Sequence, residues 1–237
     1  MEGNDRTRCA PPAARKPDVI DPLAQRILDR LSKHAEAGQI VLGGYFAMQH
    51  YLEYRNTHDI DAWWRTRADA ATEAVIREAM TGVAAEEGLE FRERRFGETL
   101  SFELRRAGRR CFSFQIAVRS VELEPPTASA WPPIQIETLQ DNLGAKMNAL
   151  VDRGAPRDFT DVMHVVKAGL ADTARCWELW SRKNPGQPVS AARDKVLHHL
   201  AELASRRPVD SIADPSERQR ARDTREWYRL EFLRAGE

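Results

Sequence analysis

VLGGYFAMQHYLEYRNTHDIDAWW, from Val41 to Trp64, decides the fold of this chain. It reads as an apolar run, the glycine pair Gly43-Gly44, a helix-like segment, and a short apolar strand containing Asp59 and Asp61. Residues i and i+2 of a strand point to the same face of a sheet, so the two carboxylates are expected side by side. The order strand, glycine turn, helix, strand predicts a mixed α/β domain.

The acid pair and the glycine pair together indicate a site for a metal ion and a phosphate. Two adjacent carboxylates repel each other, and a divalent cation is the usual compensation. A glycine pair lets backbone N–H groups approach a phosphate closely. Together these features are typical of enzymes that move a nucleotidyl or phosphoryl group. Taken alone, the two acids could equally belong to an edge strand on which they are solvated. The glycine pair that precedes them favours a metal and phosphate site.

Composition places the chain among globular proteins. It has 237 residues, 42% of them hydrophobic and 30% charged, and this apolar content is enough for a core. The formal net charge of zero gives no global indication of a nucleic-acid partner, although arginines crowd some segments. Cys9, Cys111 and Cys176 show no metal or disulfide spacing. Without an apolar run of membrane-spanning length or a signal peptide, we expect a cytoplasmic protein.

The periodicity changes once along the chain. We expect a flexible tail over 1–20, an α/β domain over 21–125, a proline-rich connector over 126–137 and a helical domain over 138–237. The first domain is predicted to hold helices at 22–37, 45–54 and 67–88 and strands at 39–42, 58–64, 89–94, 99–104 and 110–118. The second is predicted to hold helices at 138–153, 158–168, 171–183, 189–205 and 215–234.

Two residues before the acids are further candidates. Arg55 is suited to neutralising a triphosphate, but the sequence slightly favours a solvated loop residue. Thr57 fits a turn hydrogen bond.

Three more candidates lie in the helical half. Lys146 lies beside an apolar stripe, so periodicity alone predicts that it extends to solvent, and a phosphate ligand is the alternative. Asp158 and Asp161 open a helix, where acids complement the helix dipole.

These pieces, in this order, resemble the AbiEii/AbiGii-type nucleotidyltransferase toxin family of the DNA polymerase β-like superfamily. The first matching motif contains Gly43, Gly44, Arg55, Thr57, Asp59 and Asp61. The second is KMNALVDRGAPRDFTDV, which contains Lys146, Arg153, Arg157, Asp158 and Asp161. The resemblance spans roughly residues 38–168. It implies a nucleotidyltransferase-fold mixed sheet flanked by helices, followed by an all-helical C-terminal region that completes the active site.

The resemblance also implies roles for these residues. Asp59 and Asp61 are the implied catalytic metal ligands, holding Mg²⁺ and the NTP phosphates. Lys146 is implied to bind phosphate or promote transfer, with Asp161 or Asp158 orienting it. The nucleotide-binding set is Gly43, Gly44, Arg55, Thr57, Lys146, Asp158 and Asp161.

The implied biology is that of a toxin paired with an antitoxin. Some family members transfer nucleotides to the 3′ end of tRNA. The implied partners are therefore an NTP, an RNA acceptor and a cognate antitoxin, with arginines in 105–110 suited to an RNA backbone.

One departure keeps other functions open. The superfamily usually has a third carboxylate on a later strand, where this chain offers Gln115, and Glu103 on the neighbouring strand is a possible substitute. The alternatives are a nucleotide-binding or interaction module without catalysis, a transferase acting on a small molecule such as an antibiotic, and a helical structural protein with solvated acids.

Overall fold

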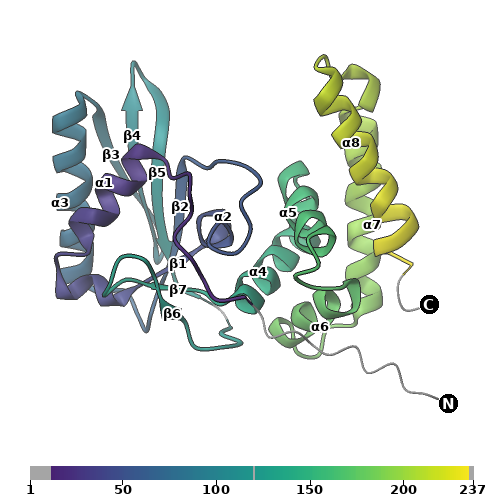
Figure 1. The fold of residues 1–237 in the computed structure, drawn as a ribbon, viewed down its shortest axis with the longest axis horizontal. Coiled ribbons are helices and arrows are strands. Elements are labelled where there is room, and N and C mark those ends of the chain that lie inside the picture. Colours follow the sequence, from purple (N-terminus) through teal and green to yellow (C-terminus); the bar gives the residue numbers. More distant parts are fainter. Residues whose placement is uncertain (1–11, 120, 235–237) are drawn as a thin grey trace.

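The fold has a sheet-containing half and a helical half, as Figure 1 shows for a computed structural model that describes residues 12–119 and 121–234. Helices α1 (Pro22–Leu31) and α3 (Ala70–Glu87) cover one side of the sheet, and helices α4 to α8 lie beyond its other side. The predicted order, an α/β region followed by an all-helical region, is confirmed.

Seven strands form one mixed sheet in the described residues, in the order β3-β4-β5-β2-β1-β7-β6. They are β1 (Ile40–Gly43), β2 (Asp59–Trp64), β3 (Glu90–Phe96), β4 (Thr99–Arg106), β5 (Arg109–Ala117), β6 (Thr127–Ala128) and β7 (Gln135–Ile136). Strand β2 is central, antiparallel to β1 and parallel to β5. The acids of β2 therefore have neighbours on both sides.

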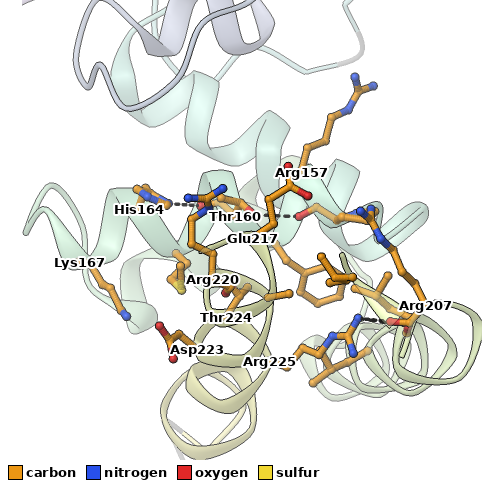
Figure 2. Close-up of a pocket in the computed structure, with 17 residues that line it drawn as sticks. Arg157, Thr160, His164, Lys167, Arg207, Glu217, Arg220, Asp223, Thr224 and Arg225 are labelled. Carbon is orange, nitrogen blue, oxygen red and sulfur yellow. Dashed lines mark hydrogen bonds between the residues drawn. The ribbon is translucent and has the colours of Figure 1, made fainter. Parts of the chain in front are cut away.

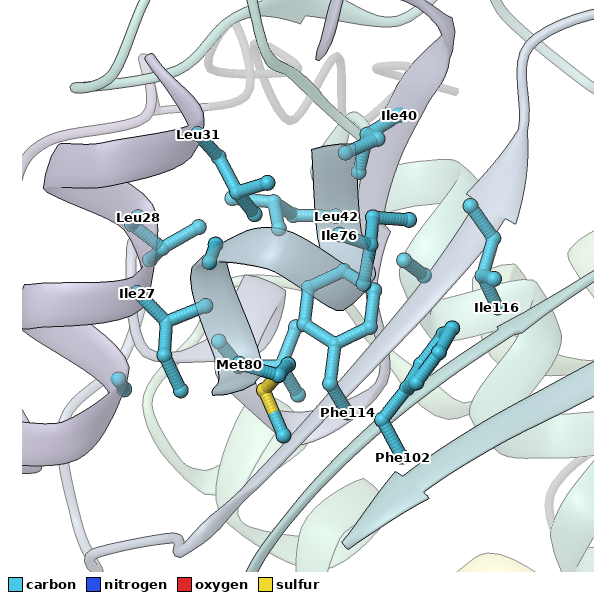
Figure 3. Packing of buried hydrophobic residues seen from close by; sticks show 14 of the residues in the cluster. Ile27, Leu28, Leu31, Ile40, Leu42, Ile76, Met80, Phe102, Phe114 and Ile116 are labelled. Carbon is cyan, nitrogen blue, oxygen red and sulfur yellow. The ribbon is translucent and has the colours of Figure 1, made fainter. Parts of the chain in front are cut away.

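One face of the sheet is apolar and packs on α1 and α3. Figure 3 shows this core, which includes Ile27, Leu28, Leu31, Ile76, Met80, Phe102 and Phe114. Because strand side chains alternate between faces, the residues between these apolar positions form a polar face. Asp59 and Asp61 lie on that polar face.

The first helix is shorter than predicted. The helix expected over 22–37 ends at Leu31, and the 3₁₀ helix η1 (Ala35–Gln39) follows. Leu31 and Ala37 are both buried in the same core. Six residues along one straight helix turn the side-chain direction by about 240°, so the helix has to end for both side chains to reach that core.

The second helix is also shorter. It was expected over 45–54, but α2 spans only Gly44–Met48. The chain then turns back so that the Tyr45 hydroxyl accepts a hydrogen bond from the Arg55 N–H at 2.9 Å and donates one to the Arg55 carbonyl at 3.0 Å. These side-chain bonds satisfy backbone groups that a longer helix would have used.

The predicted connector contributes to the sheet. Strands β6 and β7 lie within it, and β7 pairs in parallel with β1. Strands of two residues are too short to produce a periodic pattern.

The start of the described chain is also held. The backbone N–H groups of Asp18 and Val19 donate to the Glu53 carboxylate, and the Arg15 N–H donates to the His50 carbonyl at 2.9 Å. This part of the expected tail therefore contacts the α/β region. Residues 1–11 lie outside the described residues.

The helical half has its own core. It contains α4 (Leu139–Asp152), α5 (Pro156–Lys167), α6 (Thr173–Lys183), α7 (Val189–Arg206), η2 (Val209–Ser211), α8 (Pro215–Trp227) and the π-helical turn η3 (Tyr228–Phe232). Its aromatic centre is formed by Phe159, Trp177, Trp180, Trp227, Tyr228 and Phe232. Tyr45 and Met48 of α2 also pack in this cluster, so the site-bearing turn contacts both halves.

Candidate active site

Asp59 and Asp61 lie on one face of β2, as predicted. Both are partly exposed, whereas Ile60 and Ala62 on the other face are buried. Ser113 of β5 lies beside Asp59, and its hydroxyl donates to Asp59 Oδ1 at 2.6 Å. The two acids therefore lie side by side, half-buried, on the polar face of the sheet.

The glycine pair makes room for these acids. Gly44 has φ of 59°, and a Cβ built on it would overlap the carboxylate of Asp61. A Cβ built on Gly43 would overlap the indole of Trp63. Only glycine lets the β1–α2 turn approach β2 this closely. A side-chain amide then fixes the turn, because Asn142 Nδ2 donates to the Gly44 carbonyl at 2.9 Å.

Lys146 and Arg55 meet at one buried carboxylate. Lys146 Nζ lies 2.6 Å from Asp161 Oδ2, and Arg55 Nη2 lies 3.1 Å from Asp161 Oδ1. The Tyr54 hydroxyl also donates to Asp161 Oδ1. Burial alone would raise the pKa of the Asp161 carboxyl, but Lys146 and Arg55 bring it below its ordinary value. Asp161 is thus an anion that fixes two cations.

Neither cation extends freely into solvent. Lys146 is buried, and this contradicts the expectation from periodicity alone. Arg55 lies with its guanidinium carbon 3.4 Å from the centre of the Tyr45 ring, and only 31% of its side chain is exposed. The slightly favoured reading of Arg55 as a solvated loop residue is therefore wrong.

The electrostatics of Asp61 suit a metal ion. Burial raises the pKa of its carboxyl, Lys146 lowers it and Asp59 raises it, with a net upward shift. Within the described residues, no group donates a hydrogen bond to this carboxylate. Mg²⁺ is typically bound through one or two carboxylates together with water and substrate phosphates, so the donor set fits. The described residues contain no cluster of three or more His, Cys, Asp or Glu placed to hold a metal.

Comparison with known proteins identifies this arrangement. The sequence model of the family described as "Nucleotidyl transferase AbiEii toxin, Type IV TA system" matches residues 26–229. The chain belongs to the AbiEii nucleotidyltransferase toxin family. It is therefore a nucleotidyltransferase of a toxin–antitoxin system, and its membership implies a nucleotide substrate and an antitoxin partner.

The other comparisons add little. A crystal structure of a nucleotidyltransferase candidate from H. pylori has 14% sequence identity, covers 89% of this AbiEii-family chain and 93% of its own, and superposes with a TM-score of 0.46. At that TM-score, no residue role in the site is inferred from the H. pylori structure. No curated protein matches the sequence.

The third carboxylate that the sequence led us to look for does not lie beside the acids in the described part of this AbiEii-family chain. The two β5 residues beside the acids are Ser113 and Gln115, in register with Asp59 and Asp61. Glu103 lies on β4 opposite Ser113, two strands from Asp59, which corresponds to about 9.5 Å. It pairs instead with Arg105 at 2.9 Å. Glu103 therefore does not substitute for the missing acid.

Asp158 and Asp161 have different partners. We expected either one to orient Lys146, and the structure shows that Asp161 does so. Asp158 makes two bonds of 2.8 Å to Arg153 and accepts the Ala155 N–H at 3.0 Å, so it stabilises the α4–α5 turn. Both carboxylates are fully buried.

The remaining predicted residues lie close to the acids. Thr57 Oγ1 accepts the Asp59 N–H at 3.2 Å, the turn role that the sequence predicted. His58 bonds Asp21 at 2.5 Å. No helix among the described residues is long and apolar enough to cross a membrane.

Sequence reasoning missed Asn142, Tyr45 and Tyr54. Asn142 precedes Lys146 by four residues, a spacing that places both on the same face of α4 and was visible in the sequence. Tyr45 and Tyr54 gave no comparable indication, because the loop that joins them has no regular period.

Proposed function

We propose that this protein transfers a nucleotide from an NTP to a hydroxyl group of RNA, with Mg²⁺ held by Asp59 and Asp61. The observation that carries the proposal is the placement of Gly44 directly against Asp61, with Lys146 acting on the same carboxylate. A phosphate-binding turn, a carboxylate pair and a fixed cation are the parts that nucleotidyl transfer uses.

The reaction that we propose is an in-line displacement. The acceptor hydroxyl oxygen forms a bond to the α-phosphorus of the NTP, the bond to the bridging oxygen breaks, pyrophosphate leaves, and the hydroxyl proton is lost to solvent. Bound Mg²⁺ would supply positive charge to the phosphates. Gly43 and Gly44 would let the backbone contact them, Lys146 and Arg55 would add cationic charge, and Thr57 would hold the turn before Asp59.

Asp161 and Asp158 act indirectly in this scheme. Because both are fully buried and bonded to cations, we assign Asp161 the positioning of Lys146 and Arg55, and Asp158 the positioning of Arg153. Fixed cations that need no rearrangement during the reaction stabilise developing charge more than mobile ones.

We propose the 3′ end of tRNA as the acceptor and the cytoplasm, where tRNA and NTPs occur, as the location. The support is the resemblance of both motifs to transferases of this kind, together with exposed arginines at the β4–β5 hairpin, Arg106, Arg109 and Arg110. A cognate antitoxin would be the protein partner.

The test uses the protein with Mg²⁺, each α-³²P-labelled NTP in turn, and total tRNA. Asp59→Ala with Asp61→Ala is the inactive control. We expect label on RNA with the wild type only. Equal labelling by the double variant would overturn the assignment of the acids.

A second candidate function rests on one observation. Gln115 lies where a third carboxylate would help to activate the attacking hydroxyl, and the protein without that acid would bind an NTP and perform no chemistry. NTP binding without transfer to RNA, to protein or to an aminoglycoside would favour this candidate. Label on the aminoglycoside alone would instead establish a small-molecule transferase.

A further inference from the structure

A cavity lies away from the acid pair, between α5, α7 and α8 (Figure 2). Its volume is about 450 Å³, within the range of small-ligand pockets. Apolar side chains form part of its wall, among them Phe159, Met163, Leu200 and Ile212. Each of these four residues is at most 7% exposed, so they form the floor of the cavity and a ligand would mainly contact the polar rim.

The polar part of the wall is strongly basic. It carries five permanent cations and two acids, although the whole chain has no net charge. The cations are Arg157, Lys167, Arg207, Arg220 and Arg225, and the acids are Glu217 and Asp223. None of the five cations forms an ion pair with a carboxylate of the described residues. The cavity therefore attracts an anion.

Arg225 contributes to this excess of positive charge from a buried position. Only 7% of the residue is exposed, and its Nη2 donates to the carbonyls of Arg207 at 2.6 Å and Leu203 at 3.4 Å. Its Nε has no partner in the described structure. Burial and the neighbouring Arg229 and Arg207 lower the pKa of its guanidinium. A buried cation without a carboxylate is costly, and an external anion would reduce that cost.

Helix α5 connects this cavity to the acid pair. Arg157, at its start, lines the cavity and also acts electrostatically on Asp61. His164, further along, lines the cavity and stacks on Tyr54 with ring centres 3.9 Å apart, and Tyr54 bonds Asp161. An extended ligand that crosses the start of α5 would contact both places.

We propose that this cavity binds a single-stranded segment of the acceptor RNA, with phosphates at Arg220, Lys167 and Arg157. The proposal rests on the transferase function proposed above and assigns the acceptor-binding surface to the helical half. Phosphate contacts of this kind fix the register of a strand without reading its sequence.

The test measures binding of a fluorescein-labelled 12-nucleotide single-stranded RNA by anisotropy, without NTP or metal. Arg220→Glu and Lys167→Glu change exposed residues, so the fold should be retained. We expect the Kd of the double variant to rise about tenfold or more, and the salt dependence of log Kd to fall by roughly one for each contact removed.

Arg222→Glu is the matched control. It is compared with Arg220→Glu alone, because both single substitutions make the same charge change on α8, two residues apart. Arg222 does not line this cavity and pairs with Asp210 at 3.5 Å. An equal loss of RNA binding in this control would overturn the proposal, because only net charge would then matter. Displacement of the RNA by polyglutamate at equal charge concentration would also overturn it and indicate an acidic protein segment.

The two proposals can fail separately. Labelling of RNA by the wild type, together with unchanged RNA binding by the Arg220→Glu, Lys167→Glu variant, would refute the cavity and leave the transferase intact. Absence of labelling, with RNA binding lost only in that variant, would refute the transferase and leave a binding site for RNA.

Discussion

Lys146 Nζ and Asp161 Oδ2 lie 2.6 Å apart, joining two helices whose bonded residues are 15 positions apart in the sequence. Arg55, from the loop before β2, reaches the same carboxylate. Asp161 therefore links the sheet half to the helical half and fixes two cations, of which Lys146 also acts electrostatically on Asp61.

Lys146→Met should abolish most of the transfer activity. The substitution removes the ammonium group and keeps a similar volume, while Asp161 retains Arg55 and Tyr54. We expect the single-turnover rate to fall about 100-fold, the scale for loss of one electrostatic donor in an active site. The rate is measured with saturating labelled NTP at a temperature where circular dichroism shows the variant folded.

Lys183→Met is the control, because it removes another buried, ion-paired lysine that lies outside the proposed active site. Lys183 is buried and pairs with Asp141 at 2.5 Å, while Asp141 also pairs with Arg119. Removal of the lysine should therefore destabilise the fold by about 1–3 kcal/mol. We expect its transfer rate to stay near that of the wild type below the melting temperature. An equal drop in rate for both variants would assign the effect of Lys146→Met to packing.

Gly44→Ala should remove nucleotide binding. Its positive φ costs about 1–2 kcal/mol for any residue with a Cβ, and the methyl group would also overlap the Asp61 carboxylate. Gly97→Ala is matched, because Gly97 has φ of 58° and nothing within 4 Å of a built Cβ. Both should lower the melting temperature, but only Gly44→Ala should lose NTP binding in calorimetry. Intact NTP binding by Gly44→Ala would contradict the role of the turn.

Gln115→Glu should strengthen metal binding. A carboxylate at this position would lie beside Asp61 in register and complete a three-acid group. Without metal the variant should be less stable, because three carboxylates repel. With Mg²⁺ we expect affinity to rise about tenfold, which enlarges the metal-induced shift in melting temperature. Glu103→Gln should leave the metal-induced shift in melting temperature unchanged. A smaller shift in this variant would indicate that Glu103 is a metal ligand.

The local sequence pattern predicted the positions of the two acids and of the glycine pair. The alternation in DIDAWW places Asp59 and Asp61 on one face because the strand period is two, and the register on both sides confirms it. The glycine pair was equally readable, since a turn against a following strand needs residues without a Cβ.

Contacts between residues that are distant in the sequence could not be predicted from local pattern. Periodicity gives the angle of Lys146 around α4, but it does not show that Asp161 of another helix lies opposite. The same limit explains Arg55, whose partners are the Tyr45 ring and Asp161. The basic cavity was missed because Arg157 on α5 and Arg220 on α8 meet only through tertiary packing.

The stability of the sheet half should depend on pH through His50. This side chain is buried between Phe46 and Trp131, and burial lowers its pKa to about 4, against smaller upward effects from the Phe46 carbonyl and Glu53. An unfolded histidine titrates near pH 6.5. Between these values the unfolded state binds more protons, so the free energy of unfolding is highest above about pH 6.5 and falls as the pH drops toward 4, by about 3 kcal/mol in all.

His50→Phe removes this titration and keeps an aromatic ring in the pocket. Urea unfolding at intervals from pH 4.5 to 7.5 should therefore show a flatter pH dependence for this variant than for the wild type. His198→Phe, at a site where 71% of the side chain is exposed, is the control and should keep the wild-type dependence. If His50→Phe keeps that dependence too, other groups control the acid sensitivity of the fold.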